Sequence, residues 1–144
     1  MMVLAVATSV VLLALSLLHV YWAAGGRRAI DAVIPTVSGR RTLHPSRFAT
    51  LTVAAALAMA GLIAFGATGM LRTVAPAWLI RTGLVVLAAV FGLRAVGDFR
   101  LIGFTKRVKG TRFARLDTRV FSPLCVGLAV AFAALAWSSN GVSP

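Results

Sequence analysis

The chain has 144 residues, of which 60% are hydrophobic and 12% charged, and its mean hydropathy is +0.94. Soluble globular domains carry about 25% charged residues, so this composition excludes that class and indicates a membrane protein. The formal charge of +12 is confined to segments between apolar runs, where attraction to anionic lipid head groups explains it, so we expect no nucleic-acid partner.

The first predicted span covers residues 3–24, which contain no Asp, Glu, Lys or Arg. At about 1.5 Å per residue, a helix of this length crosses a hydrocarbon core about 30 Å thick. A secretory signal peptide would carry positive charge before its apolar run. Here Arg27 and Arg28 follow the run instead, so we predict a helix that is retained in the membrane.

A polar loop is predicted for residues 27–47, and the second span for residues 48–71, which are uncharged and rich in alanine. Such small residues let helices pack closely in lipid. The third span is predicted for residues 77–96, where Arg81 lies near the start and can extend outward to the interface beside Trp78.

The basic segment 97–119 separates the third span from a charge-free fourth span, predicted for residues 120–137. The segment either lies on the membrane surface as an amphipathic stretch or folds back into the membrane. Asp117 or Thr118 is expected to cap the fourth helix. Pro123 would then fall in the first two turns, where its missing N–H costs little.

The distribution of positive charge predicts the topology. Thirteen of the fifteen basic residues fall in the stretches 27–47 and 94–119, and only Arg72 and Arg81 lie elsewhere. The positive-inside rule places these two stretches in the cytoplasm and both termini outside. The chain is therefore predicted to be one all-α domain, residues 1–144, built as a bundle of four transmembrane helices in the cytoplasmic membrane.

The inventory of metal-ligating and catalytic residues is small. The single cysteine, Cys125, excludes an intrachain disulfide, and His19 and His44 lack metal-ligand spacing. Since no Gly-rich phosphate loop, heme-attachment motif or nucleophile–base pair is present, we expect no metal and no cofactor. The predicted spans hold no Asp, Glu or Lys at mid-membrane depth, which argues against ion-coupled transport.

Polar candidates gather at the predicted cytoplasmic ends of the helices. Arg94 and Asp98 are four residues apart, so on a helix they share a face and pair; alternatively, Asp98 orients Arg94 toward a phosphate or carboxylate ligand. His19 belongs to an interfacial aromatic belt, or it acts as a proton acceptor or as a ligand to an anionic group, the roles that an imidazole can take near neutral pH. Asp31, Asp98 and Asp117 are the only acids, and because arginine is near each of them we expect an Arg/Asp network.

The segment Phe91–Cys125, FGLRAVGDFRLIGFTKRVKGTRFARLDTRVFSPLC, resembles the signature of a bacterial membrane family, domain of unknown function 3995. The HVYWAAGG stretch at residues 19–26 and the Ile34–Pro35 pair resemble other recurring features of that family. The resemblance implies a small four-helix protein of the bacterial inner membrane and no established activity. Thr105 and Phe121 depart from the family pattern, which favours an aromatic residue and a tyrosine there, so any hydroxyl that this tyrosine supplies is absent here.

Three functions fit these features. The leading hypothesis is a non-enzymatic accessory protein, alone or as a homo-oligomer, that binds anionic membrane lipids. The second is a small membrane enzyme for an amphipathic anionic substrate, and the third a small-solute transporter or channel subunit. The candidate acid/base groups are His19, Asp98 and Asp117. The candidate anion-binding groups are Arg94, Arg100, Arg107, Arg112 and Arg119.

Overall fold

The structure is a computed structural model that describes residues 1–28, 34, 36–37, 40–41, 46–70 and 75–139. Its long helices are α1 (Met2–Ala23), α3 (Arg47–Gly66), α4 (Ala77–Val96) and a continuous fourth helix. The fourth helix joins α5 (Arg112–Leu116), the π-helical η1 (Asp117–Phe121) and α6 (Ser122–Ser138). All 4 are long and apolar enough to cross a membrane, which agrees with the prediction of an all-α protein with four membrane-capable helices.

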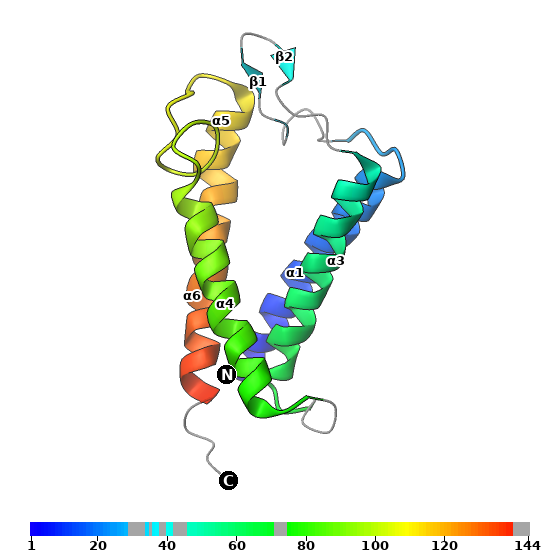
Figure 1. The fold of residues 1–144 in the computed structure, drawn as a ribbon, viewed down its shortest axis with the longest axis vertical. Coiled ribbons are helices and arrows are strands. Elements are labelled where there is room, and N and C mark those ends of the chain that lie inside the picture. The colour runs from blue at the N-terminus through cyan, green and yellow to red at the C-terminus, as the bar shows by residue number, and fades with distance from the viewer. Residues whose placement is uncertain (29–33, 35, 38–39, 42–45, 71–74, 140–144) are drawn as a thin grey trace.

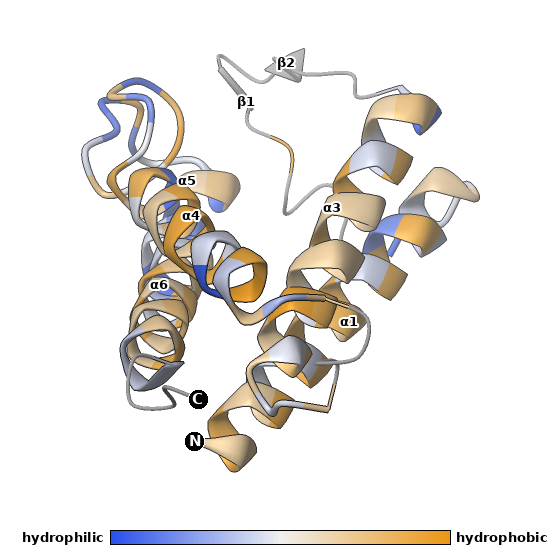
Figure 2. Cartoon of the chain, turned by 60° about the horizontal axis from the view of Figure 1, so that its bottom comes forward, coloured by the Kyte–Doolittle hydropathy of each residue, from blue (hydrophilic) through white to orange (hydrophobic). Residues whose placement is uncertain are grey.

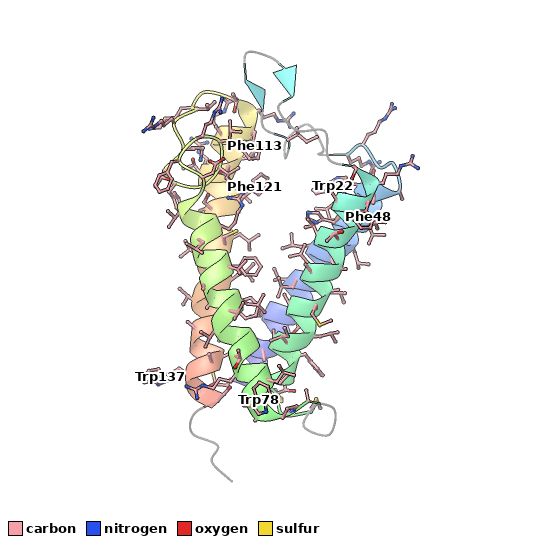
Figure 3. All side chains as sticks on the ribbon, viewed as in Figure 1. Trp22, Phe48, Trp78, Phe113, Phe121 and Trp137 are labelled. Carbon is pink, nitrogen blue, oxygen red and sulfur yellow. The ribbon has the colours of Figure 1, made fainter. Side chains whose placement is uncertain are left out.

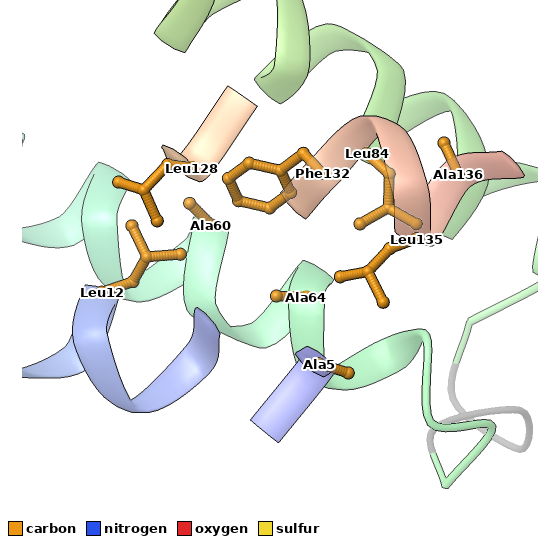
Figure 4. Close-up of a cluster of buried hydrophobic side chains, with 9 residues drawn as sticks. All are labelled: Ala5, Leu12, Ala60, Ala64, Leu84, Leu128, Phe132, Leu135 and Ala136. Atoms are coloured by element: carbon orange, nitrogen blue, oxygen red, sulfur yellow. The ribbon is translucent and has the colours of Figure 1, made fainter. Parts of the chain in front are cut away.

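The four helices form two pairs, α1 with α3 and α4 with α6 (Figure 1). The pairs meet where α1 begins and α6 ends, and they diverge toward the end that carries the long loops (Figure 1). A cluster of buried apolar side chains from all four helices joins them (Figure 4). Its members are Ala5, Leu12, Ala60, Ala64, Leu84, Leu128, Phe132, Leu135 and Ala136.

Close packing of α1 on α3 follows from the small residues of the second span, as the sequence predicted. Gly61 lies against Ser9, whose hydroxyl donates a hydrogen bond of 2.9 Å to the Gly61 carbonyl. Further along the same two helices, the Ser16 hydroxyl of α1 donates a hydrogen bond of 2.8 Å to the Ala54 carbonyl of α3. Such interhelical hydrogen bonds are possible because the backbones approach closely.

The helices are mostly hydrophobic along their length, and hydrophilic residues concentrate in the loops and near the helix ends (Figure 2). Val3, Leu17 and Leu93 are 79%, 61% and 70% exposed in the isolated chain, as expected for side chains that face lipid. Aromatic residues lie at both ends: Trp78 and Trp137 at one end, Trp22 and Phe48 at the other (Figure 3). Two aromatic belts of this kind mark the interfaces of a membrane-spanning bundle.

The predicted start of the fourth helix is wrong. The helix begins at Arg112, because the Thr111 side chain caps it by accepting a 3.0 Å hydrogen bond from the Ala114 N–H. Asp117 is therefore not a cap but lies within a π turn, in which the Ser122 N–H bonds the Asp117 carbonyl. Pro123 lies well inside the helix rather than in its first two turns; the π turn before it already interrupts the regular ladder that a proline would break.

The first long loop contains two short strands that the sequence did not predict. The strands β1 (Thr36–Val37) and β2 (Arg40–Arg41) pair in antiparallel register, Thr36 with Arg41 and Val37 with Arg40. Asp31 and His44 in this loop, and Arg72 in the second loop, lie outside the described residues.

Candidate functional site

The second long loop, residues 97–111, folds back over the end of α4. Phe104 and Thr105 donate their N–H groups to the carbonyls of Ala95 and Val96, at 2.9 and 3.2 Å. These bonds satisfy carbonyls that the last turn of a helix leaves unpaired. The loop, which we call the covering loop, thus forms a compact cover on the end of α4.

Two glycines make this fold of the loop possible. Gly97 and Gly103 both have positive φ, 95° and 82°, and their backbones are in direct contact. A Cβ on Gly97 would overlap the backbone of residues 102–103, and a Cβ on Gly103 would overlap the backbone of residues 96–97. The close approach requires glycine at both positions. It places the Gly103 N–H within hydrogen-bond distance of Asp117 on the fourth helix.

Asp117 is the centre of the polar cluster beneath the loop. Its side chain is fully buried and accepts three hydrogen bonds. Oδ1 accepts from Nη2 of Arg94 at 2.9 Å, and Oδ2 accepts from the Gly103 N–H at 2.8 Å and from Nζ of Lys106 at 2.9 Å. A buried carboxylate requires such charged donors, because burial without them would be costly.

Lys106 links the loop to the fourth helix. It is 4% exposed, and its ammonium group donates to the Gly103 carbonyl at 2.8 Å, Oδ2 of Asp117 at 2.9 Å and Oγ1 of Thr118 at 2.7 Å. An ammonium group has three N–H donors, so all of them are used inside the protein. Lys106 was not among the residues selected from the sequence, where one lysine within a basic run carries no distinguishing signal.

The predicted ion pair between Arg94 and Asp98 is wrong, since Arg94 pairs with Asp117 instead. The physical reason is that α4 ends at Val96 and Gly97 redirects the chain, so Asp98 is not on the face of a helix. Oδ1 of Asp98 accepts the N–H groups of residues 100, 101 and 102 at 3.0, 2.7 and 2.9 Å. These donors, the N–H of Ile102 foremost, hold the pKa of the exposed Asp98 carboxyl below its ordinary value.

A pocket of about 350 Å³ lies beside the cluster, between the loop and the first turns of the fourth helix. We call it the basic pocket, because four of its lining side chains are cations. Of the arginines selected from the sequence only Arg119 lines it, whereas Arg100, Arg107 and Arg112 are exposed elsewhere on the segment. The residues that line the pocket are Phe104, Lys106, Lys109, Gly110, Ala114, Arg115, Thr118 and Arg119.

His19 lies on the other helix pair. Its Nδ1 is 2.8 Å from the Leu15 carbonyl, which can only accept, so Nδ1 donates this hydrogen bond. The ring meets Trp22 edge-on, with centroids 5.1 Å apart. Across the described part of the chain, no hydrogen bond or ion pair joins His19 to Asp98 or Asp117. The structure therefore does not bring the three acid/base candidates together.

The cluster leaves two buried polar atoms without a hydrogen-bond partner among the described residues, Nη1 of Arg94 and Oγ of Ser122. Ser122 follows Asp117 by one π turn on the buried side of the helix. Within the same described residues, no group of three His, Cys, Asp or Glu side chains could hold a metal ion.

A family model described as a protein of unknown function (DUF3995) matches residues 12–132, which include α3, α4, the covering loop and the basic pocket. No curated protein and no solved structure matches the chain.

Proposed function

The chain belongs to the DUF3995 family, and we propose that it is an accessory membrane protein whose basic pocket binds the head groups of anionic phospholipids. The observation that carries this proposal is the convergence of Lys109, Arg115 and Arg119 on one volume at a helix end. The same end bears an aromatic belt, which is the depth at which head groups lie.

The charge distribution supports an orientation for this site. The start of α1 and the end of α6 lie at one end of the bundle, and the loop with the basic pocket lies at the other (Figure 1). By the positive-inside rule, the pocket end faces the cytoplasm of a bacterial cell and both termini face outward. Anionic lipids give the cytoplasmic surface its negative potential, so this orientation brings the pocket to its ligands.

The pocket adds directional contacts to a general electrostatic attraction. Each basic residue near an anionic surface contributes about 1 kcal/mol wherever it lies. A hydrogen bond to a charged group adds about 1.5–3 kcal/mol, but only if the donor reaches the ligand. Buried Lys106 and the Thr118 hydroxyl fix one wall of the pocket through their mutual 2.7 Å bond, and the exposed cations Lys109, Arg115 and Arg119 line the pocket beside this wall.

A matched pair of variants separates the pocket from the general charge. Lys109→Gln/Arg119→Gln removes two pocket cations, and Arg107→Gln/Arg112→Gln removes two exposed cations that do not line the pocket. Both variants lose the same charge from the same segment. We expect native mass spectrometry of the purified protein to show retained anionic phospholipid in the wild type and in the Arg107/Arg112 variant. The Lys109/Arg119 variant should lose it, and equal retention in the two variants would contradict the proposal.

A further inference from the structure

Most of the positive charge in the basic pocket has no carboxylate partner among the described residues. The chain has three acidic side chains. Both carboxylate oxygens of Asp117 accept hydrogen bonds, from Arg94, Gly103 and Lys106. Among the described residues Asp98 makes no ion pair; its Oδ1 holds the turn that follows α4. Among the described residues, no carboxylate therefore pairs with Lys109, Arg115 or Arg119.

The free donors of the pocket match a group with several terminal oxygens. Lys109 and Arg119 make no hydrogen bond to another described residue, and Arg115 uses one N–H on the Gly110 carbonyl at 3.0 Å. An ammonium group has three donors and a guanidinium group five. A phosphodiester offers one negative charge and two terminal oxygens. A phosphate monoester offers about −1.5 to −2 at pH 7 and three terminal oxygens.

The size and lining of the pocket fit more than a bare phosphate ion. Its volume of about 350 Å³ is at the lower end of the range for small-molecule sites. Phe104 and Ala114 add an apolar wall next to the cations. An amphipathic ligand needs both surfaces, a cationic one for the phosphate and an apolar one for the carbon atoms attached to it.

From charge, donors and size together, we infer that the basic pocket selects ligands that end in a phosphate monoester or a diphosphate over ligands with a phosphodiester. This inference rests on the proposed function, because it uses the same pocket. The same chemistry occurs in a lipid such as phosphatidic acid and in a soluble phosphate ester, so the test must distinguish the two sources.

The test is competition binding on the purified full chain in a mild detergent at pH 7.5. The probes are short-chain phosphatidic acid, short-chain phosphatidylglycerol and glycerol 3-phosphate. Phosphatidic acid should bind at least about tenfold more tightly than phosphatidylglycerol, since one further charge-assisted hydrogen bond is worth that factor. The preference should weaken at pH 5, where a monoester carries a single charge.

The outcomes separate this inference from the proposed function. Equal affinity for the two lipids would overturn the monoester preference and leave anionic-lipid binding intact, whereas no binding of either lipid would overturn both. Glycerol 3-phosphate that binds as tightly as phosphatidic acid would support the monoester chemistry and identify a soluble ligand. The preference should be lost in Lys109→Gln/Arg119→Gln and kept in Arg107→Gln/Arg112→Gln, with unchanged far-UV circular dichroism in both.

Discussion

Replacing Asp117 by Asn tests the reasoning about the buried cluster, because Asn keeps the size of the side chain and removes its charge. The two cations that pair with Asp117 are not equivalent: the Arg94 side chain is 31% exposed, whereas that of Lys106 is 3% exposed. Solvent screens the loss at Arg94, so the cost arises chiefly from the buried ammonium of Lys106. Leaving one member of a buried ion pair uncompensated costs about 3–5 kcal/mol, and we expect Asp117→Asn to lower the free energy of unfolding by that amount.

The assay is reversible unfolding in mixed micelles, followed by tryptophan fluorescence. A double-variant cycle isolates the ion pair: in a Lys106→Met background, Asp117→Asn should cost at least about 1 kcal/mol less than in the wild type. Limited trypsin digestion gives a local readout, since Arg107 and Lys109 lie in the loop that the cluster holds in place. An unfolding free energy for Asp117→Asn within about 1 kcal/mol of the wild type would refute the reasoning.

Three further predictions concern the same region. Gly103→Ala should release the covering loop and speed tryptic cleavage at Lys109, because a Cβ would overlap the Gly97 backbone at a positive φ; unchanged cleavage would contradict this. Ser122→Ala should leave the free energy of unfolding nearly unchanged or raise it, since the buried hydroxyl has no partner among the described residues. A decrease of more than about 1 kcal/mol in that free energy would show that the hydroxyl has a partner. The lowered pKa of Asp98 stabilises the fold above the ordinary carboxyl value of about 3.9, and this contribution is lost as pH falls through the lower folded pKa. Asp98→Asn should therefore flatten the acid limb of stability against pH, and an identical limb would show that Asp98 does not contribute.

Hydropathy was sufficient to predict the four spans, because backbone groups in lipid must be satisfied within helices and the apolar runs are long. The third span matches residue for residue, 77–96. The start of the fourth helix was missed because the charged Arg112 and Arg115 lower the local hydropathy, which predicts a loop. In the structure the Thr111 side chain caps the helix at this point, and Phe113 in its first turn is buried.

The polar cluster could be predicted only in part. Arg94 and Asp117 were both selected from the sequence, but spacing alone paired Arg94 with Asp98. The actual pairing depends on where α4 ends and on the contact between Gly97 and Gly103, which brings Lys106 onto Asp117. Contacts within a helix recur at fixed spacings in the sequence, whereas contacts that depend on how a loop folds back do not, so spacing cannot predict them. The two glycines were visible in the sequence, but the contact between them was not.

The central claim, that the basic pocket binds anionic head groups, is tested most directly by hydrogen–deuterium exchange of the full chain in nanodiscs. Zwitterionic lipid alone is compared with the same lipid containing phosphatidylglycerol or phosphatidic acid. We predict slower exchange with anionic lipid in peptides that cover residues 104–119, and unchanged exchange in peptides from α1 and α3. Unchanged exchange in residues 104–119, or protection spread equally over the basic residues of both loops, would contradict the claim.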